Sequence, residues 1–194
     1  MAGIAFREPE VEDAARILRW RTDPRVAAMM TGEVADDLAA QQRWLEACRT
    51  RPDYCHWIVE IGGEPAGLLS LAGYQPESRR SSWGFYIGDE SRLGFGGFIP
   101  PHFYNWAFGR LGLETLDAEV FEQNRAVIDL HRLHGYRERP EADRTVLKQG
   151  ESRRLVALSL HRDDWNRQRY RRFDADFPTA TWAARPAHLA VQAG

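Results

Sequence analysis

Residues 91–97 have the composition of a phosphate-binding turn. They read Ser-Arg-Leu-Gly-Phe-Gly-Gly and lie between a strand-like run at residues 82–88 and a helix predicted through residues 103–108. Glycine lets a backbone approach a ligand closely, and the N–H groups at a helix N-terminus carry partial positive charge. We therefore expect phosphate contacts from Arg92, Leu93, Gly94, Phe95, Gly96 and Gly97. A glycine-rich junction of this kind can also be only a tight turn, and that alternative stays open.

The residues around this turn restrict the kind of ligand. No Lys-Ser or Lys-Thr pair follows Gly97, so the lysine and the magnesium-binding hydroxyl of a nucleoside-triphosphate loop are absent. A dinucleotide-binding turn would need a third glycine at Ile99 and would follow the first strand. The pattern favours another diphosphate, that of coenzyme A. Pro100 and Pro101 lack N–H groups, so the binding amides must precede them.

A second motif follows about thirty residues later. Residues 124–136 read Asn-Arg-Ala-Val-Ile-Asp-Leu-His-Arg-Leu-His-Gly-Tyr. They resemble the N-x-x-A-I-x-L-Y-x-K-x-G-F ending of the GCN5-related N-acetyltransferases, and the Ser-x-x-Gly-x-Gly turn at residue 91 fits the same family. Ser91 stands where that family usually has Gln or Arg, and His131 where it usually has Tyr. The resemblance predicts one acetyltransferase domain over residues 1–161, followed by an extension over residues 162–194.

The resemblance implies acetyl-CoA as the cofactor and assigns roles to several residues. The glycine turn would grip the diphosphate, and Asn124 would contact the pantetheine arm. In the family, two central strands splay apart and expose N–H groups that bind the acetyl carbonyl. Those strands are expected here at residues 82–88 and 116–121, with the N–H groups near Tyr86 and Ile87 closest to the thioester.

The resemblance implies that His131 is the catalytic acid, because it stands where the family's tyrosine donates a proton to the departing thiolate. It follows Asn124 by seven residues, which is two helical turns, so both side chains project from one face. An imidazolium with a pKa of ~6.5 can protonate a thiolate whose thiol pKa is ~8.5. The alternative is a surface histidine, as His134 suggests for this helix. Glu119 or Glu122 is the candidate base, unless the amine needs none.

The N-terminal half is predicted to select the acceptor. Residues 16–30 resemble a segment shared by ribosomal-protein and N-terminal-alanine acetyltransferases and by enzymes that acetylate the 4-amino group of a UDP-linked dideoxy sugar in pseudaminic acid synthesis. Trp20, Arg21 and Trp83 offer the stacking and diphosphate-pairing groups that a nucleotide sugar uses, although Trp20 can also be core. We predict a nucleotide-linked amino sugar. A protein N-terminus and a non-catalytic acyl-CoA-binding module remain the alternatives.

Composition excludes some partners. The 194 residues are 43% hydrophobic and carry a net charge of −2, so we expect neither a nucleic acid nor a membrane partner. No leader-like or membrane-spanning run is visible, which predicts a cytoplasmic protein. Cys48 and Cys55 are the only cysteines, and we predict neither a disulfide nor a metal site from them. A homodimer is a further expectation.

Hydrophobic spacing predicts a mixed α and β domain. The family resemblance implies that its sheet is mostly antiparallel and splayed at its centre, with flanking helices. The predicted helices cover residues 9–20, 25–30, 36–49, about 100–110 and 124–134. The predicted strands cover residues 4–7, 56–61, 66–71, 82–88, 116–121, 144–148 and 154–160. In the arginine-rich extension, Trp165, Arg169 and Phe173 predict an amphipathic helix packed on the domain, followed by a loose terminus. Single-stranded nucleic acid binding is the alternative there.

Overall fold

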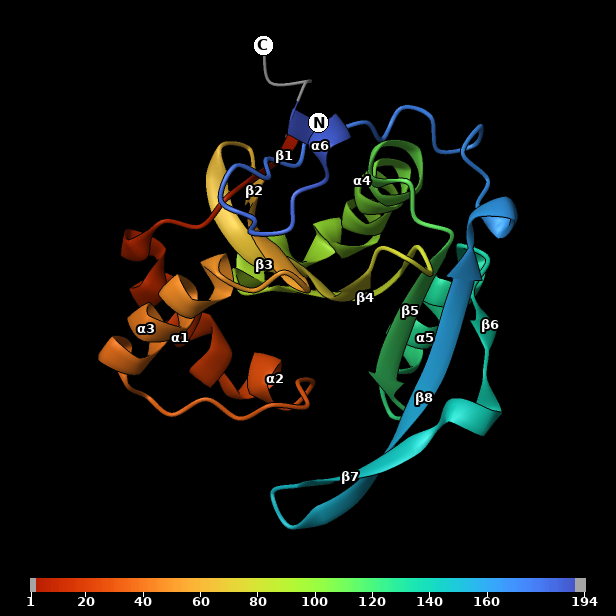
Figure 1. Ribbon diagram of the computed structural model, residues 1–194. Helices are drawn as coiled ribbons and strands as arrows, with labels where there is room; N and C mark the ends of the chain where they lie inside the picture. Colours follow the sequence, from red (N-terminus) through yellow and green to blue (C-terminus); the bar gives the residue numbers. More distant parts are fainter. Residues whose placement is uncertain (1–2, 191–194) are drawn as a thin grey trace.

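A sheet of eight strands organises residues 3–190, the part of the chain that the computed structural model describes (Figure 1). The strands follow the order β1-β2-β3-β4-β5-β8-β6, and β7 pairs with β8 off this path. Neighbouring strands are antiparallel except β4 and β5, which are parallel. The strand bounds are β1 Ile4–Arg7, β2 Tyr54–Ile61, β3 Glu64–Gln75, β4 Arg80–Ile87, β5 Thr115–Phe121, β6 Arg137–Glu138, β7 Arg144–Lys148 and β8 Glu151–His161.

Six α-helices occur in this part of the chain and cover both faces of the sheet. Ile58 of β2 packs with Ile17 and Leu45, so α1 and α3 cover one face. The neighbouring residue Trp57 points to the opposite face because strand side chains alternate, and it meets α4 there through Trp106. The helix bounds are α1 Ala14–Thr22, α2 Pro24–Ala27, α3 Leu38–Arg49, α4 Ile99–Trp106, α5 Arg125–Leu133 and α6 Ala187–Ala190.

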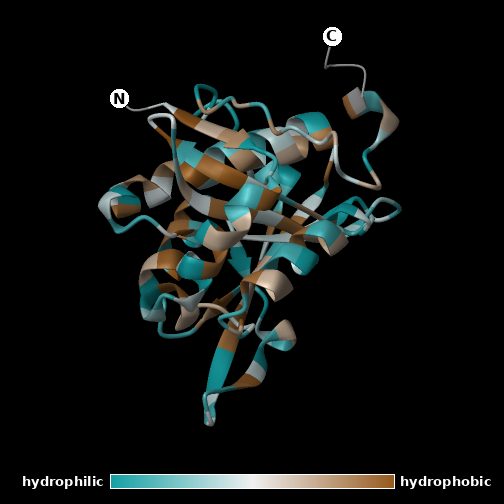
Figure 2. Ribbon diagram, turned by 90° about the vertical axis from the view of Figure 1, so that its left-hand side faces the viewer, coloured by the Kyte–Doolittle hydropathy of each residue, from teal (hydrophilic) through white to brown (hydrophobic). Residues whose placement is uncertain are grey.

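Local sequence explains where the helices near the cleft begin. The carboxylate of Asp37 accepts from the Ala40 N–H at 3.0 Å and caps α3. Pro100 and Pro101 occupy the first turn of α4, where their missing N–H groups cost nothing. After α4 the chain widens into one π-type turn and stops at Gly112, whose φ of 82° is left-handed. The hydrophobic residues gather along the central strands, and the peripheral loops are mostly hydrophilic (Figure 2).

The extension after residue 161 packs onto the α4 face. Phe177 stacks on Phe6 with ring centroids 4.1 Å apart, and the Trp57 indole N–H donates to the Pro178 carbonyl at 2.7 Å. The predicted amphipathic helix is wrong, because residues 165–173 form turns. The predicted loose terminus is also wrong up to Leu189, which is buried. Both regions share one core, and the division after residue 161 stays a prediction.

The structure confirms the fold class and most of the predicted elements. The bounds of the predicted strands at residues 82–88 and 116–121 lie within two residues of those of β4 and β5. The two-residue strand β6 was not predicted, and the predicted helix at residues 25–30 is a single turn, Pro24–Ala27. Within residues 3–190 no helix is long and apolar enough to cross a membrane.

Candidate functional site

The sheet opens between β4 and β5, as the sequence predicts (Figure 1). The two strands pair only at residues 80–82 and 115–117, and beyond that point they diverge. At the apex, Arg80 binds Asp117 through two hydrogen bonds of 2.5 and 2.8 Å, and Ser159 donates to the same carboxylate. This ion pair fixes the point at which the strands separate and leaves backbone groups on both strands without a sheet partner.

A cleft of about 490 Å³ occupies the opening. Helix α5, the glycine turn and residues 25–31 complete its walls. The cleft brings together nine of the predicted site residues: Arg21, Trp83, Tyr86, Ile87, Leu93, Gly96, Glu119, Asn124 and His131. The other predicted residues, Trp20, Arg92, Gly94, Phe95 and Gly97, do not line it.

The peptide groups of β4 alternate between the sheet and the cleft. The Gly88 N–H donates to the Ala66 carbonyl of the β3 side at 2.8 Å, and bonded pairs recur at every second residue of an antiparallel ladder. Tyr86 therefore directs its N–H toward β3, which corrects the expectation that this N–H faces the thioester. Ile87 faces the opposite way, and its carbonyl accepts from Arg25 at 3.1 Å. Its N–H group is the one available to an acetyl carbonyl.

The glycine turn is a 3-10 helix, Glu90–Phe98, that leads directly into α4. Asp89 caps it by accepting from the Ser91 N–H at 3.0 Å. Gly94, Gly96 and Gly97 all have ordinary φ angles, unlike the six described glycines with positive φ. A methyl group on Gly94 or Gly97 would meet nothing within 4 Å. The backbone does not need glycine here as a tight turn would, and the bare surface fits a ligand that approaches the main chain closely.

Arg92 adds a cation beside this bare surface. Its Nε atom is buried and has no hydrogen-bond partner among the described residues. A phosphate group bound at the turn would satisfy such a donor, because guanidinium groups pair with phosphate oxygens. The turn therefore fits the diphosphate of coenzyme A in two independent ways, through its open backbone and through this donor.

His131 lies deep in the cleft wall, with 5% of its surface exposed. Burial lowers the pKa of His131 to about 4, and the neighbouring His134 acts in the same direction. The expected imidazolium is therefore wrong at neutral pH, because the apolar surroundings disfavour the charged form. Asn124 lines the same cleft, as the seven-residue spacing predicts.

Two tyrosines that the sequence analysis did not select orient His131. The Tyr104 hydroxyl lies 3.4 Å from the Nδ1 atom of His131. The Trp83 indole N–H donates to the Tyr136 hydroxyl at 2.6 Å, and the Tyr136 ring lies against His131 with ring centroids 4.5 Å apart. Because Nδ1 of His131 faces the buried Tyr104 hydroxyl, Nε2 is the ring nitrogen left for the cleft. The only feature of the sequence that could have pointed to Tyr104 is its place in α4, on the side of that helix that faces His131 of α5.

Glu119 lines the cleft, but its carboxylate is already held. Arg144 of β7 donates to both of its oxygens, at 2.7 and 2.6 Å. Glu122, the other candidate base, pairs with Arg154 at 3.4 Å on the exposed surface. Both candidate carboxylates are therefore engaged by arginines.

The two predicted stacking tryptophans are not free platforms. Trp20 is 5% exposed and packs in the core between α1 and α3. It lies so close to Gly88 that a Cβ atom added there would be only 2.1 Å from the indole ring. Trp83 is 7% exposed and stacks on Phe85 and Phe103, so it forms the floor of the cleft. The structure corrects the stacking role predicted for both.

Two arginines stand at the acceptor side of the cleft. Arg21 donates only to the Gly32 carbonyl, at 3.3 Å, and its Nε atom is buried without a partner. Burial raises the pKa of the Tyr54 and Tyr86 hydroxyls, and the positive charge of Arg21 opposes that rise. Arg25 donates to the carbonyls of Ile87 and Gly88 and so fixes the end of β4. Within residues 3–190 neither arginine forms an ion pair, and the absence of a nearby carboxylate was not visible in the sequence.

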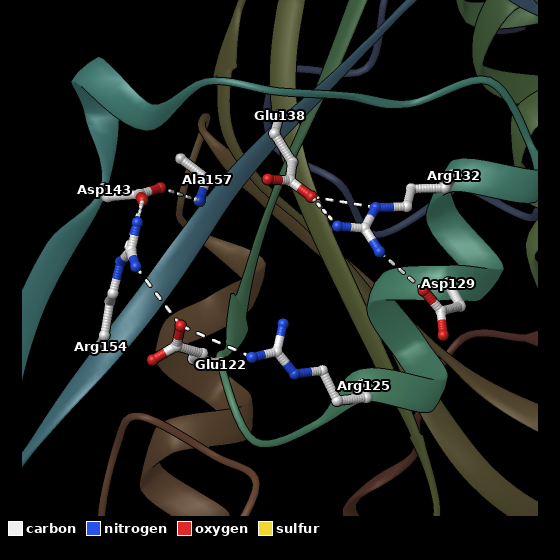
Figure 3. A network of polar contacts seen from close by, with 8 residues as sticks. All are labelled: Glu122, Arg125, Asp129, Arg132, Glu138, Asp143, Arg154 and Ala157. Carbon is white, nitrogen blue, oxygen red and sulfur yellow. Dashed lines mark hydrogen bonds and ion pairs between the residues drawn. The ribbon is translucent and has the colours of Figure 1, made fainter.

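A polar network on the outer surface holds α5 in place (Figure 3). It joins α5 to β6, to β8 and to the loop that precedes β7. Arg154 binds Asp143 at 2.5 Å, and Asp143 also accepts from the Ala157 N–H at 2.8 Å. Arg132 of α5 binds Asp129 at 2.8 Å and also Glu138. None of the network's residues lines the cleft, and the network anchors α5, the helix that carries His131.

Comparisons with known proteins agree with this geometry. A family model described as an acetyltransferase (GNAT) domain matches residues 4–137. The spermidine N-acetyltransferase from Vibrio cholerae, solved in complex with CoA and spermine, is similar with a TM-score of 0.75 and 15% identity over 83% of this chain and 96% of that chain. A dodecameric structure of the same enzyme is similar with a TM-score of 0.73 and 15% identity, over 85% of this chain and 97% of that chain. The structure of a probable acetyltransferase has a TM-score of 0.72 and 18% identity, over 84% of this chain and 94% of that chain. No curated protein matches by sequence.

Proposed function

We propose which acceptor this chain uses, starting from the fact that it belongs to the GNAT acetyltransferase family. The proposed acceptor is a small amine that carries an anionic group, and more narrowly a nucleotide-linked amino sugar that is acetylated on its amino group. By family membership the chain is an acetyl-CoA-dependent N-acetyltransferase. Spermidine N-acetyltransferase is prominent among the similar solved structures, and identities of 14–18% establish only a common fold. The acceptor must therefore be argued from the cleft.

The observation that carries the proposal is the unpaired guanidinium of Arg21. A polyamine is a polycation and needs free carboxylates to bind it. The carboxylate in this cleft, Glu119, is neutralised by Arg144, whereas Arg21 and Arg25 have no acidic partner among the described residues. A guanidinium in a partly desolvated cleft favours phosphate or carboxylate groups. The charge distribution therefore supports an anionic acceptor.

The chemistry that we assign to the cleft is a proton transfer through one neutral histidine. The thioester of acetyl-CoA supplies the acyl group. The Ile87 N–H donates a hydrogen bond to its carbonyl, where negative charge develops. Nε2 of His131 takes the proton of the attacking amine as the new N–C bond forms, and releases it to sulfur as the C–S bond breaks. The proton count balances without a carboxylate base.

The Tyr104 hydroxyl makes this role of His131 workable. We assign His131 the tautomer in which Nδ1–H donates to the Tyr104 hydroxyl, which leaves Nε2 free to take a proton. A pKa of about 4 makes the transient imidazolium a strong acid toward a thiolate. Asn124 and the glycine turn would position the cofactor.

An acceptor panel tests the proposal. A UDP-linked 4-amino sugar, spermidine and peptides beginning with Ala or Ser are compared by kcat/KM, with thiol release as the readout. We expect the sugar nucleotide to be turned over fastest. Arg21→Ala should raise its KM about tenfold or more, on the order of one charge-assisted hydrogen bond, and change the KM of a simple amine little. Arg19→Ala, an exposed neighbour on α1, is the matched control. Faster turnover of spermidine or peptides would overturn the proposal.

A further inference from the structure

A second cavity of about 370 Å³ adjoins the cleft on its acceptor side. It lies between α1, α3, strand β3 and the loop at residues 33–37. Helices α1 and α3 are at the left of Figure 1. The two cavities share Arg21 and Leu68 in their walls. A ligand whose anionic group binds Arg21 can therefore extend in two directions, toward His131 in the cleft and toward α3 in this side pocket.

Gln41 is the unusual residue of the side pocket. It lies on α3, its side chain lines the pocket, and it is 5% exposed. Its Nε2 atom is buried and has no hydrogen-bond partner among the described residues. A buried amide without a partner destabilises a fold, so such a group calls for an explanation. A ligand with a hydrogen-bonding edge would supply the missing partner.

Trp44, one helical turn further along α3, adds a flat surface. Its ring is 36% exposed and contributes to the pocket wall. His56 stacks on it with centroids 5.2 Å apart and an interplanar angle of 18°, and Tyr54 meets it edge-on at 6.1 Å. These contacts fix the indole plane. A fixed indole beside an amide is suited to a planar heteroaromatic ring that both stacks and hydrogen bonds.

The acidic residues at the rim do not oppose an anionic ligand strongly. Glu33 lies 3.6 Å from the Lys148 ammonium, which projects from the tip of the β7–β8 hairpin. The carboxylate of Asp37 accepts from the Ala40 N–H at the N-terminus of α3, where the partial positive charge of the helix offsets it. The guanidinium of Arg21 has no such partner among the described residues, so it is the charge that a ligand meets between the two cavities.

We propose that the side pocket is a nucleobase subsite, in which Gln41 hydrogen bonds to the edge of the base, Trp44 packs against its face and Arg21 binds the adjoining diphosphate. The inference deepens the proposed function and rests on it. It assigns the remote part of the acceptor to α3, away from the reacting amine, so that binding energy there orients the amine toward His131.

The test measures binding of UDP and of inorganic pyrophosphate by calorimetry in the presence of coenzyme A. Gln41→Leu should weaken UDP binding tenfold or more and leave pyrophosphate binding unchanged. Its melting temperature should equal or exceed that of the wild type, because the substitution removes an unpaired buried amide. Gln42→Leu, the exposed neighbour on the same helix, should change neither affinity. Trp44→Leu, at a partly exposed position, should weaken UDP binding in the same selective way.

The outcomes separate the two proposals. Equal UDP affinity in the wild type, Gln41→Leu and Trp44→Leu, with pyrophosphate still bound through Arg21, would overturn the nucleobase subsite and leave the anionic acceptor standing. No binding of either UDP or pyrophosphate would overturn both. Loss of pyrophosphate binding in Gln41→Leu together with a lowered melting temperature would assign Gln41 a structural role and also reject the subsite.

Discussion

The two sides of the cleft differ in how their residues are held. On the acetyl side, partners within the sheet and α4 hold the residues of the site. Asp117 binds Arg80 at the apex, and the Tyr104 hydroxyl of α4 lies against His131. On the acceptor side, Arg21 and Gln41 carry buried polar atoms that lack partners among the described residues. The groups around the reacting thioester are placed before an acceptor arrives, and the unpartnered Nε of Arg92 is assigned to the cofactor phosphate. The unpartnered donors of Arg21 and Gln41 are left for the acceptor. Such a difference is expected of an enzyme that shares its cofactor with the rest of its family but takes an acceptor of its own.

The largest expected effect comes from breaking the acetyl side at its centre. His131→Phe should lower kcat about 10²-fold and leave the KM of acetyl-CoA near its starting value, because the residue acts in the chemical step and not in cofactor binding. His134→Phe replaces a buried histidine that does not line the cleft and should keep kcat. Full turnover by His131→Phe, measured by thiol release, would reduce His131 to a packing residue.

The next effect concerns the glycine turn. Gly94→Leu should weaken acetyl-CoA binding about fivefold or more, since a side chain on this open surface keeps the diphosphate from the backbone N–H groups. The melting temperature should stay close to that of the wild type, because nothing lies within 4 Å of the added Cβ atom. Ser91→Ala, whose hydroxyl is directed to Asp89, is the control and should bind normally. Calorimetry that finds equal affinities for all three proteins would exclude this turn as the diphosphate site.

A smaller and graded effect appears in stability against pH, and it compares the two sides directly. His131 and His134 on the acetyl side and His56 on the acceptor side each have a pKa lowered to about 4, mainly by burial. The unfolded chain, with histidine pKa values of ~6.5, binds more protons between these values. The free energy of unfolding should therefore fall as the pH is lowered from about 6.5 to 4 and be insensitive to these groups above 7.

Urea unfolding across this range measures the effect. Each fully buried histidine is expected to contribute a loss on the order of 3 kcal/mol by pH 4, from the cost of ~1.4 kcal/mol per pKa unit. His131→Phe should make the pH dependence shallower. An unchanged slope in this variant would mean that the ring is hydrated in solution. A similar change in His56→Phe would place the acceptor-side histidine in an equally dry environment.

The same contrast explains what the sequence could and could not predict. The shared face of Asn124 and His131 and the place of the glycine turn follow from short-range spacing, because helical turn and strand period fix them locally. The splay between the two strands was implied by the family resemblance. The charge state of His131 depends on aromatic rings from α4 and β4, which are distant in sequence. The pairing of Glu119 with Arg144 likewise joins β5 and β7, two strands that are separated in the sequence by α5. Trp20 failed as a stacking residue because helical spacing cannot distinguish a core tryptophan from an exposed one.

The most direct test of the account is a crystal structure of the protein with coenzyme A and UDP. The account predicts the diphosphate of coenzyme A on the backbone of residues 91–97, the UDP diphosphate within ion-pair distance of Arg21, and the uracil ring between Gln41 and Trp44. Coenzyme A bound elsewhere, or UDP absent from the cleft while spermine occupies it beside Glu119, would contradict the central claim that this acetyltransferase takes an anionic acceptor.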